Sequence, residues 1–399
     1  MLKIVFIITL LYFLFRNRID IYLIFFLSNV LYGSHIIYGK VWVPPYETIV
    51  QINAEIILSI VFIGACIFTF IVDRKQKHVI LQDNKIPYIP KIWIDITFLV
   101  TWTLFVFIIY YSITTGSMDK KNLKSLSYAY FFFQYLSGVS FIFTWTLERK
   151  INKVLGTLPI VFLLFTGARA YAVLSFLSVI FIRLYNKKIF SRDVLKKGIF
   201  VVVIPLATVL SRYWSQLMMI KPSNQLSYLF IIFGSYEWGQ ISWNLNATTD
   251  ASYTSAHSYY AVIFGSLPLL HRFIDFGERS FSHHINVIAY EQLNIDSYGV
   301  AGTFWGESYV LGGFIGVFIH LLIILLIIRF FNKKILYNNS PIYPIYAIAL
   351  LFFSFYAPRN DIQNLIATLF NLIIFSSFYF LTYQFIPKHK KIIKIKGHD

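Results

Sequence analysis

Long apolar runs alternate with short polar and basic connections along almost the whole chain. Many of these runs approach the roughly 20 residues that a helix needs to cross the hydrocarbon core of a bilayer. The pattern predicts an all-α polytopic membrane protein with about 11–12 transmembrane helices. The runs lie at about 2–15, 19–38, 53–72, 93–114, 127–147, 151–166, 170–186, 198–214, 304–330, 341–357 and 363–386.

One long interruption, residues 214–302, separates the eighth run from the ninth. No internal repeat and no Pro-, Gly- or Ser-rich linker divides the chain, so we expect residues 1–399 to form a single membrane domain. Residues 214–302 would then be a long periplasmic or external loop, in which residues 226–233 and 259–270 are apolar enough to be interfacial or re-entrant helices. Long loops in compact proteins are often lids or binding elements, so we expect a site beneath this one.

Composition changes the picture by excluding whole classes of protein. Hydrophobic residues make up 57% of the chain and charged residues only 13%, whereas soluble domains carry about 25% charged residues. A soluble enzyme is therefore excluded, and the 19% of aromatic residues suits a chain anchored at two membrane interfaces. The single cysteine, Cys66, excludes a disulfide framework and a cysteine-based metal site.

The net charge of +17 comes from lysines and arginines in the connections between runs. If the tail from Lys388 to Lys396 is cytoplasmic, the connections on its side hold most of the 35 basic residues and fewer than half of the 18 acidic ones. This asymmetry obeys the positive-inside rule, so we expect a cytoplasmic C-terminus and no nucleic-acid partner. No small-residue cleavage site precedes Arg16, and we therefore expect the first run to be an uncleaved span.

Arg169 lies in a turn between two short apolar runs. Residues 151–183 are barely enough for two crossings, so we expect this turn to lie below the outer surface with Arg169 partly buried. An arginine near the bilayer centre costs about 2.5–3.5 kcal/mol on insertion scales, and such a residue usually faces a polar cavity or an anion. The alternative is a guanidinium that reaches the headgroups.

Glu307 lies among aromatic residues and glycines at the start of the ninth run. A carboxylate persists there when it is paired, protonated or in contact with a ligand, and the alternative is an ion pair that only holds helices together. Gly312 and Gly316 form a Gly-x-x-x-Gly pattern, which allows helices to approach closely. Arg359 and Asp361 lie in the turn before the last run, where a solvated turn would also favour this composition.

The densest polar run of the long loop combines histidines with arginines. A histidine takes up a proton near neutral pH and an arginine holds phosphate through two hydrogen bonds, so this composition suits chemistry with a phosphate leaving group. His283 and His284 are adjacent and would chelate one metal poorly, so we expect no metal site. The candidates from this run are His271, Arg272, Arg279 and His283. The chain has no Asp-x-Asp, His-Glu-x-x-His or Gly-x-Ser-x-Gly pattern, which argues against metal and serine hydrolases.

Three short motifs, in this order, resemble those of bacterial O-antigen/polysaccharide polymerases of the Wzy type. They are Gly-x-Arg at 167–169, an aromatic-Gly-Glu-x-Tyr-x-x-Gly-Gly-x-x-Gly stretch within 302–316 after the long loop, and Arg-x-Asp at 359–361 before the final run. The likeness covers roughly residues 125–385. One departure is that Ala168 and Ala170 flank Arg169, where family members often have serine.

The resemblance implies a multi-pass glycosyltransferase of the bacterial inner membrane with a fold similar to the GT-C class. Such enzymes join oligosaccharide repeat units carried on undecaprenyl pyrophosphate at the outer face, so donor and acceptor are both lipid-linked and a chain-length regulator protein is a further partner. Eleven runs with an outward N-terminus fit the family's usual even number of spans poorly, and we expect the count to be wrong by one. No cofactor is implied.

The roles that we expect combine this resemblance with the chemistry of the side chains. Pyrophosphate would be held by Arg169 and Arg359, with Arg279 and Arg272 as helpers. The proton of the acceptor hydroxyl would pass to Glu307, His271 or His283, in that order, with Asp361 and Tyr309 in support. The alternatives are an O-antigen ligase, with the same leaving group and a different acceptor, and a polysaccharide flippase or transporter, a class that tends to show paired repeats.

Overall fold

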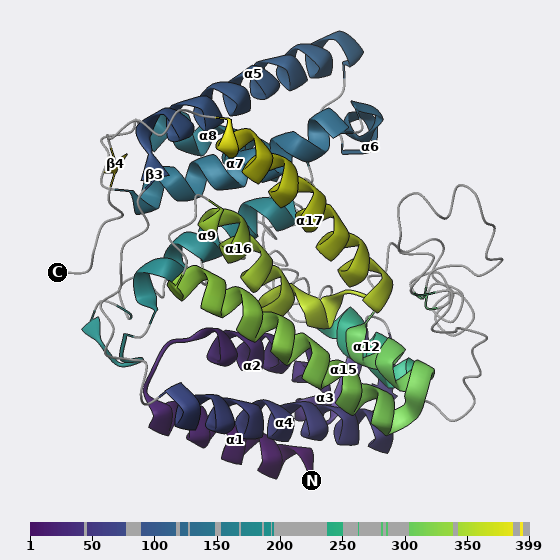
Figure 1. Cartoon of the computed structure of the whole chain (residues 1–399). Coiled ribbons are helices and arrows are strands. Elements are labelled where there is room, and N and C mark those ends of the chain that lie inside the picture. The colour runs from purple at the N-terminus through teal and green to yellow at the C-terminus, as the bar shows by residue number, and fades with distance from the viewer. Residues whose placement is uncertain are drawn as a thin grey trace. The chain divides into compact units, whose positions relative to one another are not determined.

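The computed structural model is built almost entirely of helices (Figure 1). It describes residues 1–43, 46–76, 89–116, 120–126, 128–147, 153–166, 169–185, 187–192, 194, 238–249, 262, 281, 285, 303–337, 342–385 and 392–393. Within these ranges, four helices are long and apolar enough to cross a membrane: α4 (Ile52–Gln76), α5 (Lys91–Thr115), α15 (Phe304–Tyr337) and α17 (Ile362–Gln384). This agrees with the predicted all-α membrane protein.

The remaining described elements are shorter. The helices are α1 (Leu2–Arg16), α2 (Ile21–Tyr32), α3 (Ser34–Tyr38), α6 (Lys120–Leu123), α7 (Tyr128–Thr146), α8 (Lys153–Phe165), α9 (Arg169–Leu184), α12 (Trp238–Thr248) and α16 (Tyr343–Leu351). Single turns of 3-10 or π-helix occur at η1 (Lys124–Leu126), η4 (Phe352–Tyr356) and η5 (Ala357–Arg359). Two antiparallel strand pairs join β1 (Lys40–Val43) to β2 (Tyr46–Ile49) and β3 (Ile89–Pro90) to β4 (Ile392–Ile393). The apolar run predicted at 198–214 lies outside the described residues.

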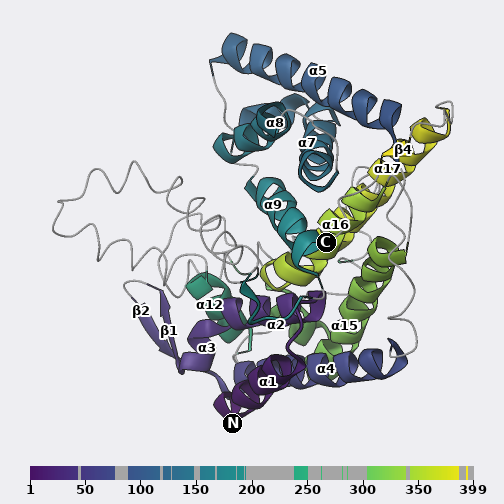
Figure 2. The ribbon, with the colours of Figure 1, turned by 90° about the vertical axis from the view of Figure 1, so that its left-hand side faces the viewer.

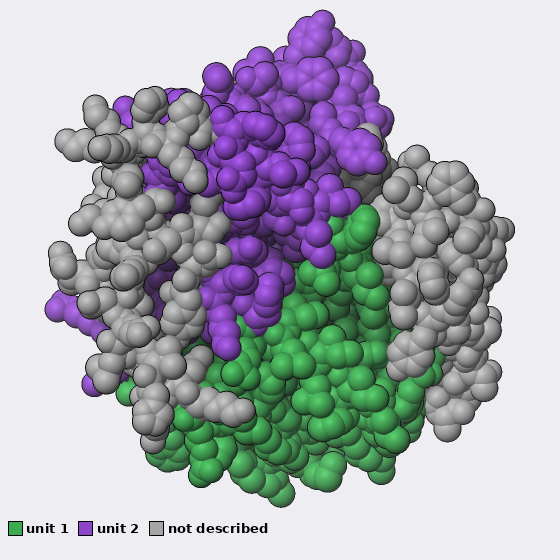
Figure 3. All heavy atoms as spheres, in the orientation of Figure 1, with its two compact units in different colours: residues 1–81, 211–329, 352–370 green, residues 82–210, 330–351, 371–399 purple. Residues whose placement is uncertain are grey.

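The chain divides into two compact units, which Figure 3 colours separately. Unit 1 comprises residues 1–81, 211–329 and 352–370. Unit 2 comprises residues 82–210, 330–351 and 371–399. Each unit combines segments from distant parts of the sequence, so neither is a continuous stretch of chain that could be cut out as a domain.

In unit 1, α1 and α4 run in the same direction and α2 runs against them. The amino group of Met1 lies 4.0 Å from the carboxylate of Glu55 at the start of α4, and Arg16 pairs with Asp73 near the end of α4. Aromatic rings fill the space between the three helices. Phe26 of α2 lies 5.0 Å from Phe13 of α1 and 5.3 Å from Phe62 of α4, measured between ring centroids.

Helix α15 is a helical hairpin rather than one straight rod. The ring of Phe304 lies 6.1 Å from that of His320, whereas residues this far apart in a continuous helix are about 24 Å apart. The rings of Tyr309 and Phe314 also meet, at 5.2 Å, and both pairs are centred on the non-helical backbone of Gly312 and Gly313. A short arm before these glycines therefore folds back along the long arm that follows them, which Figure 1 shows as the hook of α15.

The reversal depends on Gly313. Its φ of 59° and ψ of −150° lie in a region that is essentially restricted to glycine, whereas the φ of −160° at Gly312 is extended and open to any residue. The Gly-x-x-x-Gly pattern of Gly312 and Gly316 is therefore interrupted by a turn and does not form the helix-packing surface that the sequence predicted. The long arm, at about 1.5 Å per residue, still spans the roughly 30 Å of a bilayer.

Gly313→Ala should lower the free energy of unfolding by about 1–3 kcal/mol, because the alanine would be held in a strained conformation. No atom lies within 4 Å of a Cβ added at Gly313, so the expected effect comes from the backbone rather than from a clash. The measurement is the unfolding of the purified protein in detergent, with Gly312→Ala as the matched control. Equal losses in the two variants would contradict the assignment of the turn to Gly313.

Unit 2 is organised around α7. Most of its side chains are buried, because α5, α8, α9 and α16 all pack against it. Hydroxyl groups bond across these contacts: Thr101 of α5 lies 2.8 Å from Ser140 of α7, and Tyr171 of α9 donates to Tyr135 of α7 at 3.2 Å. The predicted pair of short crossings at 151–166 and 170–186 corresponds to α8 and α9.

Candidate functional site

The candidate site of unit 1 is assembled on two adjacent polar residues of α2. The hydroxyl of Ser28 donates to the backbone oxygen of Phe355 at 2.5 Å. The side-chain oxygen of Asn29 accepts a hydrogen bond from the indole of Trp305 at 2.6 Å. Helix α2 thereby holds both the short arm of α15 and the segment that precedes α17, although these segments are far apart in the sequence.

The segment before α17 is irregular and largely buried. It consists of the π-helical turn η4 and the 3-10 turn η5, in which Ala357 and Pro358 are buried. π-Helical turns within helical proteins frequently occur at functional sites. The sequence left open a solvated turn at this position; Ala357, Pro358 and Asp361 are buried, whereas Arg359 and Asn360 are partly exposed.

Asp361 caps the N-terminus of α17. Its carboxylate accepts a hydrogen bond from the backbone N–H of Asn364 at 2.7 Å, and its backbone oxygen accepts from Leu365 at 3.1 Å. Aspartate is among the residues preferred at this position because its side chain satisfies an N–H group that lacks a partner within the helix. Asp361 thus fixes the start of α17.

Glu307 reaches the same helix terminus from the short arm of α15. Its carboxylate accepts a hydrogen bond from the backbone N–H of Ile362, the first residue of α17. The side chain is 0% exposed. A helix N-terminus carries a partial positive charge, and this environment stabilises buried carboxylates. The second motif therefore contacts the residue that directly follows the third motif.

Arg359 is the cation of this site. Its guanidinium lies 5.1 Å from the ring centroid of Tyr356, and the residue is only partly exposed. The neighbouring Asn360 donates from its side chain to the backbone oxygen of Tyr356 at 2.8 Å, which further fixes the turn. Tyr309, two residues after Glu307, is partly buried and packs its ring against Phe314.

Part of the predicted external loop is folded into the same unit. Helix α12 is almost fully buried, and Figure 2 shows it beside α3 and the β1–β2 hairpin. Asn246 accepts from the backbone N–H of Gln51 at 2.6 Å and donates to the backbone oxygen of Ile49 at 3.0 Å. A second bond joins Ser242 to the backbone oxygen of Tyr32 at 2.8 Å. Residues 238–249 of the predicted loop are therefore folded into unit 1.

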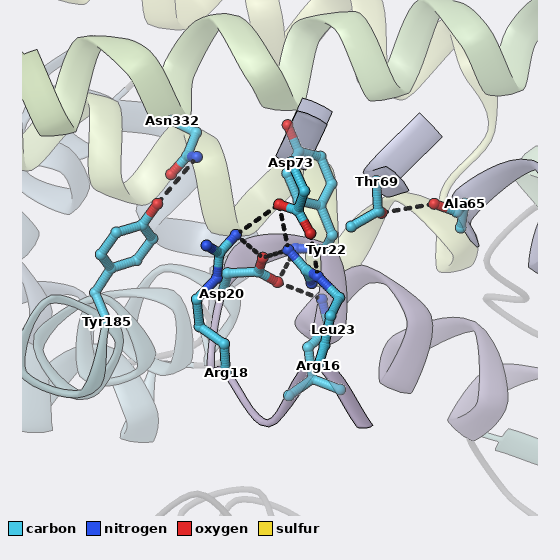
Figure 4. Close-up of polar contacts among 10 residues, drawn as sticks. All are labelled: Arg16, Arg18, Asp20, Tyr22, Leu23, Ala65, Thr69, Asp73, Tyr185 and Asn332. Carbon is cyan, nitrogen blue, oxygen red and sulfur yellow. Dashed lines mark hydrogen bonds and ion pairs between the residues drawn. The ribbon is translucent and has the colours of Figure 1, made fainter. Parts of the chain in front are cut away.

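A second polar cluster joins α1, α2 and α4 at the end of unit 1 where Arg16 lies (Figure 4). Arg16 pairs with Asp20 at 2.5 Å and with Asp73 at 2.6 Å, while Arg18 bonds the same two carboxylates at 3.2 and 2.9 Å. Asp20 is 1% exposed and also caps α2 by accepting from the N–H groups of Tyr22 and Leu23. Burial lowers the pKa of Arg16, but Asp73 and Asp20 outweigh this effect and raise it above its usual range.

The other predicted site residues belong to unit 2 or lie outside the described residues. Arg169 is the first residue of α9 and belongs to unit 2, and its side chain lies outside the described part of the structure. Three residues before Arg169, the hydroxyl of Thr166 lies 3.1 Å from the hydroxyl of Tyr130. His271, Arg272, Arg279 and His283 lie outside the described residues.

Sequence reasoning missed Ser28, Asn29 and Asp20. A signal was present for the first two, since a Ser-Asn pair interrupts an otherwise apolar run, and polar side chains inside such runs usually face other parts of the protein. Within the described ranges, no group of three or more His, Cys, Asp or Glu residues is placed to hold a metal ion. Comparison of the chain with protein-family models, with curated proteins and with solved structures found no match.

Proposed function

We propose that the protein is a polysaccharide polymerase of the bacterial inner membrane. It would join undecaprenyl-pyrophosphate-linked oligosaccharide repeat units into O-antigen or a related surface polysaccharide at the outer face of that membrane. The proposal includes about 11–12 transmembrane helices in a GT-C-like arrangement, with the C-terminus in the cytoplasm. A chain-length regulator would be a further protein partner.

One observation carries this proposal. The second and third motifs of the resemblance meet at the N-terminus of α17, where Glu307 bonds Ile362 three residues after Arg359. Polar and charged groups buried in a membrane protein are costly, so their convergence on an irregular, buried turn supports a functional site. Two of the motifs that carry the resemblance in the sequence are therefore neighbours within unit 1.

The proposed reaction transfers a glycan chain between two lipid carriers. The terminal hydroxyl of the acceptor repeat unit attacks the anomeric carbon of the donor chain, and the bond from that carbon to the pyrophosphate oxygen breaks. The hydroxyl proton passes to a base, for which Glu307, His271 and His283 are the candidates. Undecaprenyl pyrophosphate leaves with added negative charge.

Arginines would stabilise that charge. A preformed cation in a site of low dielectric constant stabilises the charge of the transition state more than water would, because it needs no reorganisation during the reaction. Arg359 and Arg169 take this role, with Arg279 and Arg272 in support. The proposed enzyme therefore needs no metal ion for its leaving group.

The hairpin in α15 also favours a second candidate. Secondary transporters bind their substrates where transmembrane helices are broken, and the reversal at Gly313 is a break of that kind. A polysaccharide flippase would use such a site to move the lipid-linked unit across the membrane rather than to extend it. An O-antigen ligase remains the alternative within the same chemistry, with lipid A-core as acceptor.

Deletion of the gene in its host separates the three candidates. For a polymerase, the surface glycan resolved by size on a gel should collapse from a ladder to a single repeat unit on its normal acceptor. Accumulation of long lipid-linked polymer would identify a ligase instead. Precursor confined to the cytoplasmic leaflet would identify a flippase, and an unchanged ladder would contradict all three.

A further inference from the structure

We infer that Glu307 is a positioning residue, which fixes Arg359 by bonding the N-terminus of α17, and that it is not the group that takes the proton. This inference rests on the proposed function and narrows it. It removes the first of the three candidate bases and leaves the proton transfer to the long loop.

The burial of Glu307 is the first step. A group that takes a proton from a substrate hydroxyl must come within about 3 Å of it, directly or through one water molecule. Glu307 is 0% exposed, and its neighbours on the short arm are buried as well. Trp305 is held by Asn29 of α2, and Gly306 lies so close to Thr248 of α12 that an added Cβ would come within 2.5 Å of the threonine hydroxyl.

The hydrogen bond of Glu307 is the second step. Its carboxylate already accepts from the backbone N–H of Ile362, a group that has no partner within its own helix. Asp361 satisfies a neighbouring N–H group, that of Asn364, at 2.7 Å. Two carboxylates from different segments therefore each accept a hydrogen bond from one N–H group of the same helix terminus. Such an arrangement orients a helix, and it commits one of the two carboxylate oxygens of Glu307 to a structural contact.

The rigidity of the link to Arg359 is the third step. Between the bonded Ile362 and Arg359 the chain is held at each point: Asp361 caps α17, and Asn360 donates to the backbone of Tyr356 at 2.8 Å. Pro358 restricts the backbone on the other side. A shift of the α17 terminus is therefore passed on to the backbone of Arg359, which carries the guanidinium.

The test compares Glu307→Gln with Glu307→Ala, each expressed in the deletion strain. Glutamine keeps an oxygen that can accept from the N–H of Ile362 but cannot act as a base near neutral pH. We expect Glu307→Gln to restore the polysaccharide ladder to within about twofold of wild type, and Glu307→Ala to reduce it about tenfold or more. Glu55→Ala, which removes a partly exposed carboxylate of α4, is the control and should leave the ladder unchanged.

A second measurement does not depend on activity. Amide hydrogen exchange of the purified protein, read on a peptide covering residues 357–366, should be about tenfold faster in Glu307→Ala than in wild type or Glu307→Gln. A peptide from α4 reports whether the variant is folded. Unchanged exchange in Glu307→Ala would overturn the inference, as would loss of the ladder in Glu307→Gln with exchange still slow.

Failure of the proposed function looks different from failure of this inference. If the deletion strain keeps a normal ladder, the protein is not the polymerase, whatever the Glu307 variants do. The exchange measurement then still decides whether Glu307 fixes the terminus of α17.

Discussion

Replacing Arg359 by alanine should reduce the polysaccharide ladder about 100-fold or more while the protein stays in the membrane at its normal level. The guanidinium lies against Tyr356 at the end of an irregular buried turn, three residues before the helix terminus that Glu307 and Asp361 occupy. In the proposed function, Arg359 is the guanidinium of this turn that binds the incoming pyrophosphate. Its loss would leave the departing negative charge without its cation.

Two variants test whether charge or shape matters at this position. Arg359→Lys keeps the positive charge but loses the planar fork that binds two phosphate oxygens, so an intermediate ladder is expected. Arg74→Ala is the matched control. Arg74 also lies over an aromatic ring, that of Phe70 at 4.4 Å, but it belongs to α4, next to Asp73 of the second polar cluster. Arg169→Ala should behave like Arg359→Ala, and a full ladder in either variant would remove that arginine from the pyrophosphate site.

Asp20→Ala should strongly destabilise unit 1, lowering the free energy of unfolding by about 3–5 kcal/mol. The carboxylate is 1% exposed, bonds both Arg16 and Arg18, and caps α2. Its removal leaves one remaining carboxylate, Asp73, for two guanidinium groups in a site that water reaches poorly. The measurement is chemical or thermal unfolding of the purified protein in detergent.

Two further variants of this cluster serve as controls. Asp73→Ala should cost less than Asp20→Ala, because the Asp73 side chain is 27% exposed and water can replace it. The double variant Asp20→Ala with Arg18→Ala restores one acid for one base, and it should be more stable than Asp20→Ala alone. If the two losses simply add, the cluster does not act as a coupled network.

Helix ends were the easiest feature to predict from the sequence. Basic and polar residues limit the apolar runs, and the runs expected at 2–15, 53–72 and 93–114 agree within a few residues with α1, α4 and α5. Long apolar segments bounded by charged residues leave few alternatives to a helix in a membrane protein. The turn before α17 was also located correctly, because proline, asparagine and aspartate mark it.

The path of the chain inside an apolar run could not be predicted in the same way. Both arms of α15 are apolar, so hydropathy gives no sign that the chain reverses at Gly313. The Gly312–Gly313 pair is compatible with close packing and with a turn, and only the backbone angles of these glycines and the ring contacts across them distinguish the two. Asp20 posed the same problem, since a single acidic residue beside two arginines is typical of an ordinary solvated connection.

The hydrogen bond between Glu307 and Ile362 can form only late in the synthesis of the chain. A ribosome makes Glu307 55 residues before the N–H group that it binds. Until α17 emerges, the short arm of α15 carries a carboxylate whose helix terminus has not yet been made. The final helix therefore completes the assembly of segments made much earlier, and quality control in the membrane could distinguish finished chains from unfinished ones at this contact.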